Sequence, residues 1–546
     1  MADQFFNGAG SDPVEGAIRR FEDLTVEEIT GSLSMSPSRP EWMTTRFPVS
    51  MEEYQQLEIE ARQPDPQTKR ASAAALDVQQ DETSDETDQA TTMAAQDVPE
   101  DEAPASAPQP TAPNFTASFE GIPQTAFRPP DCAVATGPDR VMAAVNVELA
   151  VYAKNGALQF RWPGMASLFT PVLPAGAQLF DPQLAYDHYS GRWVVVVAAR
   201  RGSPAGSWLM VGVSQGSNPA GPYWIWALDA TLDGSTQTNN WADYPMLGFD
   251  TQAIYISSNM FGFSSGFQYT KLRILNKAEL YAGGVGPGHF IRWYDFFGLR
   301  NPDNSLAFTV LPAKHFRGLG GNPPAYLINA LFPGGDKLTL WNLNNPLALW
   351  SGGAPTLARN FVNCRSYSLP PDAQQAGTAT RIETNDTRLL HAVFQNAGGV
   401  QRLWACHTSR FSWSGDTEAR SVVQWYEIDV PTRTVIQQNA YGQSGKYYYF
   451  STIQTDLSRN AHLVFSRSGT TEFAQVRQTG RKVADPPNTL QGSALVRAGV
   501  ASYTGGRWGD YFGSCRDAAD PQTVWLYGEY AQAGNTWGTR ICATRF

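Results

Sequence analysis

The chain has 546 residues, of which only 17% are charged while 12% are aromatic, a balance typical of many short strands rather than of helical bundles. The formal net charge of −10 comes from residues 1–110, which hold 23 acidic and 7 basic side chains, whereas residues 111–546 carry a net charge of +6. This near-neutral body argues against a nucleic-acid site, and no run approaches the roughly 18 apolar residues of a membrane span.

Residues 1–62 are predicted to contain two short amphipathic helices. Ser11 or Asp12 would cap the first helix. The second begins after Ser50, and Glu53 three residues later completes a capping-box pattern. Two short helices cannot bury a core of their own. This region is therefore a docking or targeting segment, a cap packed on the rim of the body, or a fraying tail.

Residues 63–118 are predicted to be a disordered, acidic linker. They are rich in Ala, Thr, Gln, Pro, Asp and Glu and contain almost no large apolar side chain. Such a segment cannot recover the entropy lost on ordering. Its acidic clusters at 81–88 and 97–102 repel one another and favour an extended chain.

From about residue 119 the sequence becomes a series of β-hairpin units. The clearest phrases are Trp241-Ala242-Asp243-Tyr244 and Trp508-Gly509-Asp510-Tyr511, each followed by a turn and an apolar strand. Hairpin units at roughly even spacing, with little helix between them, indicate an all-β fold and a β-propeller. Residues 119–546 are predicted to form seven blades, with six or eight as alternatives. The last strand ends at the C-terminus, which fits closure of a ring by a terminal strand.

Six tryptophans of this body are expected to pack between blades, as most aromatic side chains of a propeller do. They are Trp162, Trp193, Trp226, Trp404, Trp425 and Trp508. A short helix is expected at 276–281, at the edge of the third blade.

The body resembles a group of bacterial exported β-propeller proteins, described as sialidase-like (BNR-type) or of uncharacterised function. The resemblance covers about residues 119–546. It is carried by Pro129-Pro130-Asp131, Phe180-Asp181-Pro182, Asp243-Tyr244-Pro245, Asn385-Asp386-Thr387-Arg388, Gln424-Trp425-Tyr426-Glu427-Ile428, Arg507-Trp508-Gly509-Asp510-Tyr511 and Gly528-Glu529-Tyr530. It implies a propeller fold, but no established reaction comes with it. The chain departs from the group at Cys132, where a small polar residue is more usual.

The resemblance also implies an extracellular or cell-surface location. Members of the group usually carry an export signal, but residues 1–10 lack a basic segment followed by an apolar one. Export would therefore use a route without a classical signal peptide, and a cytoplasmic location is the alternative.

The repeated aspartates form a candidate metal site. Each would stand at the start of an innermost strand and point toward one end of the central channel, with Ser451 in place of Asp in the sixth unit. The predicted ligands are Asp131, Asp181, Asp243, Asp386 and Asp510. Calcium suits such a ring because it takes oxygen ligands in flexible geometry. Alternatively, each carboxylate accepts backbone N–H bonds from the neighbouring blade.

A second set of residues would serve a sialidase-like hydrolase or lyase. Such an enzyme needs arginines around a substrate carboxylate, a tyrosine nucleophile and an acid/base carboxylate. The candidates are Asp243, Arg388, Arg507, Asp510 and Tyr511. Ligand binding is also assigned to Arg388 and Arg507, together with Trp224 and Trp293 as sugar-stacking surfaces.

The five cysteines leave two alternatives open. Cys364 with Cys406, and Cys515 with Cys542, would form disulfides within blades, leaving Cys132. Otherwise all five are buried free thiols.

These observations favour a non-enzymatic recognition or assembly module with a protein or glycan ligand on one propeller face. The N-terminal arm would tether it to a larger assembly through residues 1–62. The alternative is the carbohydrate-active enzyme described above. An enzyme should bring its candidate residues together in one deep pocket, whereas a binding module should show a broad, shallow face.

Overall fold

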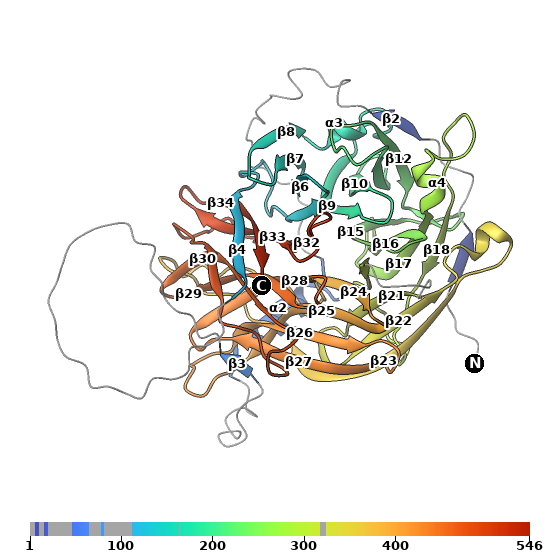
Figure 1. The fold of residues 1–546 in the computed structure, drawn as a ribbon. Coiled ribbons are helices and arrows are strands. Elements are labelled where there is room, and N and C mark those ends of the chain that lie inside the picture. The colour runs from blue at the N-terminus through green and yellow to red at the C-terminus, as the bar shows by residue number, and fades with distance from the viewer. Residues whose placement is uncertain are drawn as a thin grey trace, which may run out of the picture.

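The computed structural model describes residues 6–9, 16–19, 46–64, 78–80, 112–162, 164–316 and 324–546. These residues form an all-β molecule with a propeller arrangement (Figure 1). The first strands of successive units, β5, β9, β15, β19, β24, β28 and β32, contact one another in a closed ring. The channel inside this ring is the axis of the propeller.

Five sheets stand as separate blades, and the strands within each are antiparallel. The first contains β5 (Ala133–Thr136), β6 (Arg140–Val145), β7 (Glu148–Ala153) and β8 (Leu158–Trp162). The second contains β9 (Gln178–Asp187), β10 (Arg192–Arg201), β11 (Gly206–Ser214) and β12 (Tyr223–Asp229), with β2 (Ala17–Arg19) at its edge. The third contains β19 (Leu311–Pro312), β21 (Ala325–Ala330), β22 (Gly334–Asn344) and β23 (Thr356–Ser368). The fourth contains β28 (Lys446–Thr455), β29 (Ala461–Gly469), β30 (Glu472–Arg481) and β31 (Ala494–Arg497), and the fifth contains β32 (Gly513–Arg516), β33 (Val524–Gln532), β34 (Thr536–Arg545) and β4 (Asn114–Glu120).

The remaining two four-stranded units belong to one eleven-stranded sheet. One unit is β15 (Asn240–Phe249), β16 (Ala253–Gly262), β17 (Phe267–Asn276) and β18 (Trp293–Phe297), with β1 (Phe6–Ala9) outside it. The other is β24 (His391–Ala397), β25 (Val400–Phe411), β26 (Arg420–Asp429) and β27 (Thr434–Gly442), with β3 (Val78–Gln80) outside it. Strand β20 (Lys314–Phe316) lies between the two units and pairs in parallel with both β15 and β24.

The prediction of seven blades is therefore wrong, because five blades stand alone and the other two four-stranded units are merged into one sheet through β20. Strand β19 has only two residues and ends at Pro312. Ala313 still donates its backbone N–H to the carbonyl of Tyr326 in the same blade, at 2.9 Å. Residues 314–316 then fill the gap between β15 and β24.

A strand from the start of the body completes the last blade. Strand β4 pairs antiparallel with β34, with Phe119 opposite Ile541 and Asn114 opposite Arg545. The ring is closed by this N-terminal strand, whereas the sequence suggested the C-terminal one. The body also begins at 114 instead of 119, so the last five residues assigned to the linker are strand.

The predicted N-terminal helices have different outcomes. Helix α2 (Met51–Arg62) follows the N-cap Ser50, whose hydroxyl accepts a hydrogen bond from the Glu53 N–H at 3.1 Å, which confirms the second helix. The first helix is wrong where it can be examined, because Ala17–Arg19 form β2 and pair with β12; the rest of it lies outside the described residues. The short helix expected at 276–281 is confirmed as α4 (Lys277–Tyr281), capped by Asn276.

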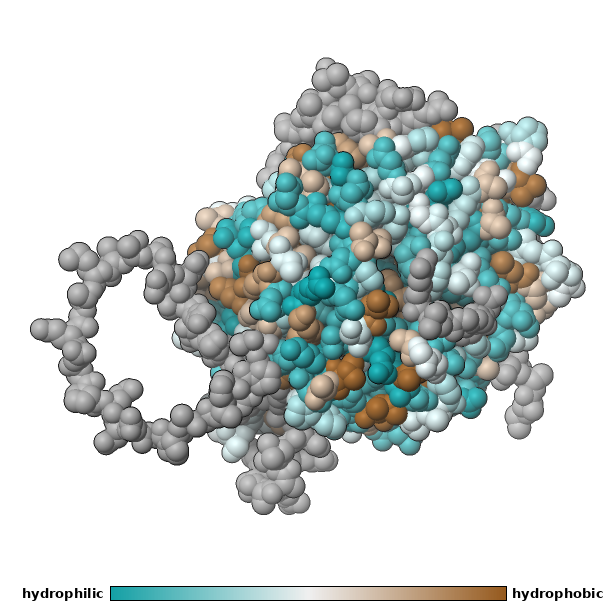
Figure 2. All heavy atoms as spheres, viewed as in Figure 1, coloured by the Kyte–Doolittle hydropathy of each residue, from teal (hydrophilic) through white to brown (hydrophobic). Residues whose placement is uncertain are grey.

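Few other elements interrupt the sheets. They are α3 (Ala166–Phe169), the 3₁₀ helix η4 (Ala348–Ser351) and the hairpin of β13 (Leu232–Asp233) and β14 (Thr236–Gln237). No helix in the described ranges is long and apolar enough to cross a membrane. The face shown in Figure 2 is largely hydrophilic, with apolar side chains scattered over it.

The core lies between neighbouring sheets, and all six tryptophans predicted to pack there are fully buried. The five cysteines are free thiols, so the disulfide alternative is wrong. Cys515 and Cys542 lie on β32 and β34, which are separated by β33. Strands two apart are about 9.5 Å from each other, beyond the roughly 7 Å Cα separation that a disulfide can span.

Candidate functional site

The mouth of the channel is built on a backbone feature that recurs in six units. At or shortly before the innermost strand, one non-glycine residue has φ between 50° and 64°. These residues are Asp131, Asp181, Tyr244, Thr309, Asn385 and Phe450. Left-handed backbone costs roughly 1–2 kcal/mol for an L-residue, so each must be held in place by its neighbours.

The aspartates predicted as one ring do not all occupy this position. Asp131 and Asp181 are themselves the left-handed residues, whereas Asp243 precedes Tyr244 and Asp386 follows Asn385. A shift of one residue along a strand turns the side chain to the other side. Accordingly, Asp131, Asp181 and Asp510 come together, with one oxygen of each within 4.8 Å of the others. Asp386 instead forms a two-bonded ion pair with Arg388, at 2.7 and 2.9 Å.

The converging carboxylates fasten one blade to the next. Asp131 Oδ1 accepts the backbone N–H of Asp510 at 2.8 Å, which joins the first unit to the last. Asp181 Oδ2 accepts the N–H of Tyr244 at 3.2 Å. Between the two aspartates, the Asn146 amide donates to Asp131 and accepts the Asp181 N–H at 2.7 Å. These hydrogen bonds correspond to the alternative to metal binding, in which each carboxylate accepts backbone N–H bonds from the neighbouring blade.

Burial makes this cluster costly to charge. Burial raises the pKa of Asp181 well above its ordinary value, and the nearby carboxylates of Asp131, Asp243 and Asp510 raise it further. Uptake of a proton or of another cation by this cluster would lower that cost. The pKa of buried Glu529 is raised as well, first by burial and then by Asp131.

The donor set fits a calcium ion poorly. Calcium takes six to eight oxygen ligands, yet both Asp131 oxygens already accept hydrogen bonds and Asp510 Oδ1 accepts one from Arg507. In the described part of the chain, Asp181 and Asp510 each keep one oxygen without such a bond. Calcium stays a prediction, and a proton is the simpler means of neutralising the cluster.

The candidate catalytic residues also gather at this mouth, but most of their polar atoms are engaged. The Arg388 guanidinium, besides its bonds to Asp386, lies 4.8 Å from the ring centre of Tyr244. Arg507 pairs with Asp510 and lies 3.6 Å from a Glu383 oxygen. The Tyr511 hydroxyl donates to the carbonyl of Pro182 at 2.8 Å. They therefore resemble a closed internal network more than a substrate pocket.

Asp243 is the exception. Its side chain is half-buried, and no described residue donates a hydrogen bond to its carboxylate. Burial raises its pKa to about 6, an effect that the Arg46 guanidinium opposes and the Asp510 carboxylate strengthens.

Residues 46–64 cover this mouth; the sequence left a cap on the rim of the body open as one alternative for this region but did not place it over these residues. The carbonyl of Arg46 accepts a hydrogen bond from Arg388 Nη2 at 3.0 Å, and the Tyr54 hydroxyl donates to the carbonyl of Asn385 at 3.0 Å. The rings of Phe47 and Tyr54 stack, and they share an apolar cluster with Leu369 of the body. We name residues 46–64 the cover segment. Tyr54 and Ala61 are the buried residues of α2, and their spacing of seven residues, which places them on one helical face, was the available sequence signal.

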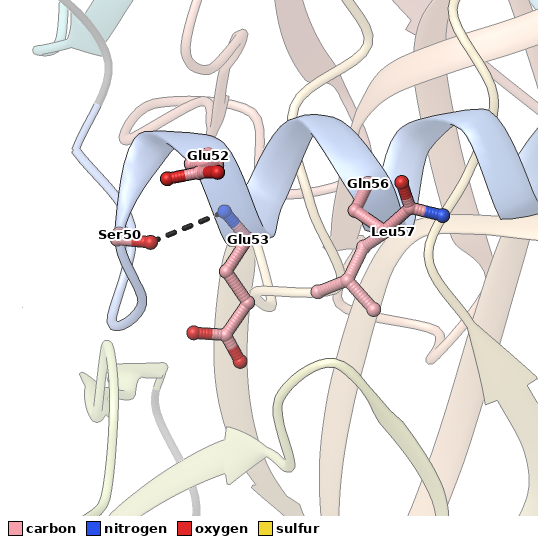
Figure 3. A pocket seen from close by; sticks show the side chains of 5 residues that line it. All are labelled: Ser50, Glu52, Glu53, Gln56 and Leu57. Atoms are coloured by element: carbon pink, nitrogen blue, oxygen red, sulfur yellow. Dashed lines mark hydrogen bonds between the residues drawn. The ribbon is translucent and has the colours of Figure 1, made fainter.

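On the opposite face of α2, the acidic side chains of Glu52 and Glu53 are exposed to solvent. Figure 3 shows a shallow hollow on that side, lined by Ser50, Glu52, Glu53, Gln56 and Leu57. Apart from half-buried Leu57, these residues are exposed. Helix α2 thus has one exposed, acidic face and one apolar face, and the apolar face covers the mouth.

The inner side of the cover segment is held by a proton-sensitive contact. Burial, followed by the neighbouring Asp372 carboxylate, raises the pKa of Glu58 to about 8. Arg62 of the same helix lies 3.5 Å from an Asp372 oxygen. Because the folded pKa lies above the usual 4.5, docking of α2 is strongest below about pH 4.5 and weakens as the pH rises through 8.

We therefore expect hydrogen exchange of the α2 amides to speed up between pH 6 and 9, after correction for the intrinsic exchange rate. Glu58→Gln should abolish this pH dependence, because the amide cannot ionise. Exposed Glu52→Gln is the matched control and should preserve it. An unchanged pH profile in Glu58→Gln would contradict the proposed contact.

The tryptophans assigned to sugar stacking differ in position. Trp293 is fully buried, its indole N–H donates to Asp295 and its ring lies under the Arg273 guanidinium at 4.4 Å. It is therefore not available on the surface. Trp224 is half-buried, and its ring lies 4.5 Å from that of His289.

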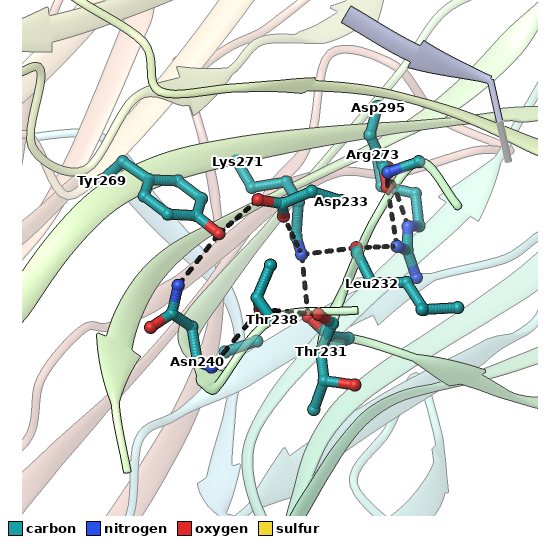
Figure 4. A network of polar contacts seen from close by, with 12 residues as sticks. Thr231, Leu232, Asp233, Thr238, Asn240, Tyr269, Lys271, Arg273 and Asp295 are labelled. Carbon is teal, nitrogen blue, oxygen red and sulfur yellow. Dashed lines mark hydrogen bonds and ion pairs between the residues drawn. The ribbon is translucent and has the colours of Figure 1, made fainter. Parts of the chain in front are cut away.

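A second polar network, which the sequence did not predict, lies behind the β13–β14 hairpin (Figure 4). Lys271 Nζ donates to Asp233 Oδ1 at 3.0 Å and to the carbonyls of Ala230 and Leu232. Arg273 forms a two-bonded ion pair with Asp295, at 2.8 and 2.9 Å. Because the buried cations are matched by acceptors, this network anchors the hairpin to β17 and β18.

Searches against family models and against curated proteins found no match. Among solved structures, the chain is similar to a protein of unknown function from Dyadobacter fermentans, with 9% identity and a TM-score of 0.35 over 69% of this chain and 97% of that one. It is also similar to Trypanosoma rangeli sialidase, with 8% identity and a TM-score of 0.32 over 78% and 59%. A third similar structure is the α-L-arabinofuranosidase of Fusarium graminearum, with 10% identity and a TM-score of 0.28 over 64% and 89%.

Proposed function

We propose that this chain is a non-enzymatic recognition or assembly module, built on a propeller whose acidic mouth is closed by its own cover segment. One observation carries the proposal. Apart from Asp243, the residues suited to catalysis at the mouth are engaged in contacts within the protein, and Arg388 among them bonds to Arg46 of the cover segment. Their contacts hold the ring together, which leaves the remaining surface of the propeller for a protein or glycan partner.

The arm before the cover segment is the proposed tether to a larger assembly, at the cell surface or outside the cell. Strands β1 and β2 support a more specific role, since they add to the outer edges of β18 and β12. Edge addition of this kind is a common way to hold an extended segment. Segments within 1–19 would then dock on the propeller while the rest of the arm engages the assembly.

The alternative function, a carbohydrate-active hydrolase, is favoured by Asp243 alone. A carboxyl group with a pKa of about 6 that receives no hydrogen bond from the described residues is suited to proton transfer near neutral pH. Such an enzyme would be latent, because Arg46 of the cover segment lies close enough to act on the charge of Asp243.

Two variants separate these functions. Tyr54→Ala opens the mouth but keeps the arm, whereas deletion of residues 1–45 removes the arm but keeps the cover segment. We expect no turnover of aryl glycosides by the wild type or by Tyr54→Ala, and loss of partner capture only in the deletion. Turnover by Tyr54→Ala that disappears in Tyr54→Ala/Asp243→Ala would establish the enzyme. Partner capture and localisation unchanged by the deletion would refute the tether.

A further inference from the structure

Strand β15 places an aromatic ring and a carboxylate on the same side, next to the cover segment. Trp241 and Asp243 are two residues apart on β15, and both lie before the register shift in its pairing with β16. Residues two apart on a strand point to the same face, roughly 7 Å from each other. One cationic side chain can therefore lie over the ring and also act on the carboxylate.

The cover segment supplies such a cation. The Arg46 guanidinium lies over the Trp241 ring, 5.5 Å from its centre. Burial raises the pKa of Asp243, and among the charged side chains that oppose this rise, Arg46 has the largest effect. The Arg46 carbonyl accepts the hydrogen bond from Arg388, which holds the main chain at this point. Arg46 thus joins an aromatic face to a carboxylate, a combination that suits a guanidinium.

The propeller body does not complete this site by itself. No described residue donates a hydrogen bond to the Asp243 carboxylate, and two body arginines whose charges act on it are paired with other carboxylates. Arg388 forms its ion pair with Asp386, and Arg507 forms one with Asp510. The strongest complement to Asp243 therefore comes from the cover segment, which docks on the body through contacts of its own.

A third body arginine determines which cation suits the site. The Arg200 guanidinium lies 4.6 Å from the centre of the same Trp241 ring, and burial and the charge of Arg46 lower the pKa of Arg200. This repulsion makes Arg46 easier to displace than the ring and the carboxylate alone would allow. It also favours a guanidinium over an ammonium group, because a guanidinium is planar, is more weakly hydrated and stacks on aromatic faces.

We propose that Trp241 and Asp243 form a recognition site for an arginine side chain, and that Arg46 is its internal ligand. A partner protein that presents an arginine would displace Arg46, so partner and cover segment compete for the mouth. Lysine would be a poorer ligand, and an uncharged side chain of the same shape poorer still. The site is distinct from the outer surface proposed above for a partner, so the two proposals can fail separately.

The test adds Nα-acetyl-arginine methylamide to the full chain carrying Arg46→Ala, which vacates the site, and follows binding by calorimetry. We expect saturable binding in the millimolar range. The citrulline analogue, which has nearly the same shape but no charge, should bind at least about tenfold more weakly, a factor within the range of one partly desolvated cation–π contact. The wild type should also bind the arginine compound at least about tenfold more weakly, because Arg46 competes for the site.

Further variants locate the site. Arg545→Ala removes a half-exposed arginine that pairs with Asp520, and this matched control should bind as the wild type does. Equal binding of the arginine and citrulline compounds by Arg46→Ala, or binding that survives in Arg46→Ala/Asp243→Asn, would overturn the proposal. So would saturable binding of sodium acetate by the wild type that is lost in Arg46→Ala, because it would place an anion between Arg46 and Arg200 instead.

Discussion

Replacing Asp131 by alanine is expected to lower the free energy of unfolding by about 4 kcal/mol. The carboxylate accepts hydrogen bonds from the Asp510 N–H and the Asn146 amide, and bonds to a charged group contribute roughly 1.5–3 kcal/mol each. Alanine would also have to adopt φ near 54°, at a further cost of about 1 kcal/mol. Relief of repulsion with Asp181 offsets part of this loss. Urea unfolding followed by tryptophan fluorescence measures the change.

Two control variants give this prediction its specificity. Asp131→Asn keeps one acceptor and tolerates the left-handed backbone, so we expect a loss of about 1.5 kcal/mol. Asp139→Ala removes a carboxylate that is 67% exposed and paired only with Arg140, and should change stability by less than about 0.5 kcal/mol. If Asp131→Ala proved as stable as Asp139→Ala, the blades would not depend on this fastener.

Tyr54→Ala is expected to weaken docking of the cover segment by about 3–4 kcal/mol. Tyr54 is only 3% exposed, stacks on Phe47 and bonds to Asn385, and removal of a buried aromatic side chain has a cost of this size. The other contacts of residues 46–64, such as those of Arg46 with Arg388 and of Arg62 with Asp372, remain in the variant, so the effect should be local. Hydrogen exchange of the α2 amides should rise at least about a hundredfold, while the melting temperature of the propeller changes little.

Tyr54→Phe and Gln56→Ala serve as controls for that result. Tyr54→Phe loses only the bond to Asn385 and should weaken docking by about 1 kcal/mol. Gln56 is exposed on the other face of α2, and its replacement should leave exchange unchanged. If Tyr54→Ala left α2 fully protected, the cover segment would be held by contacts other than those described here.

Local signals in the sequence predicted part of this structure well. The capping pattern of Ser50 and Glu53 located α2, and the repeated turn-and-strand phrases located the innermost strands of the propeller. Both signals depend on residues close in sequence. The insertion of β20 was not predictable in this way, because the proline that ends β19 says only that the strand stops. Where residues 314–316 go is decided by the gap between two other units.

The candidate site, too, was predictable from the sequence only in part. The sequence identified Asp131, Asp181 and Asp510 as axial residues, and they meet. It placed Asp243 and Asp386 in the same ring because a similar phrase surrounds each of them. Asp243 precedes the left-handed Tyr244 and Asp386 follows the left-handed Asn385, so each lies one residue away from the position that Asp131 and Asp181 occupy, and its side chain points elsewhere. The sequence left a packed cap open as one alternative for residues 1–62 but did not place it over the mouth, because the contacts of the cover segment with the body join residues more than 300 positions apart in the chain.

Calorimetric titration with calcium, paired with thermal melting, tests most directly whether the axial carboxylates are fasteners neutralised by a proton. The account predicts no saturable calcium binding and no rise in melting temperature at millimolar calcium, and a lower melting temperature for Asp131→Ala with or without the ion. Micromolar binding that raises the melting temperature of the wild type, and that is lost in Asp181→Asn, would contradict the account. The mouth would then be a calcium site.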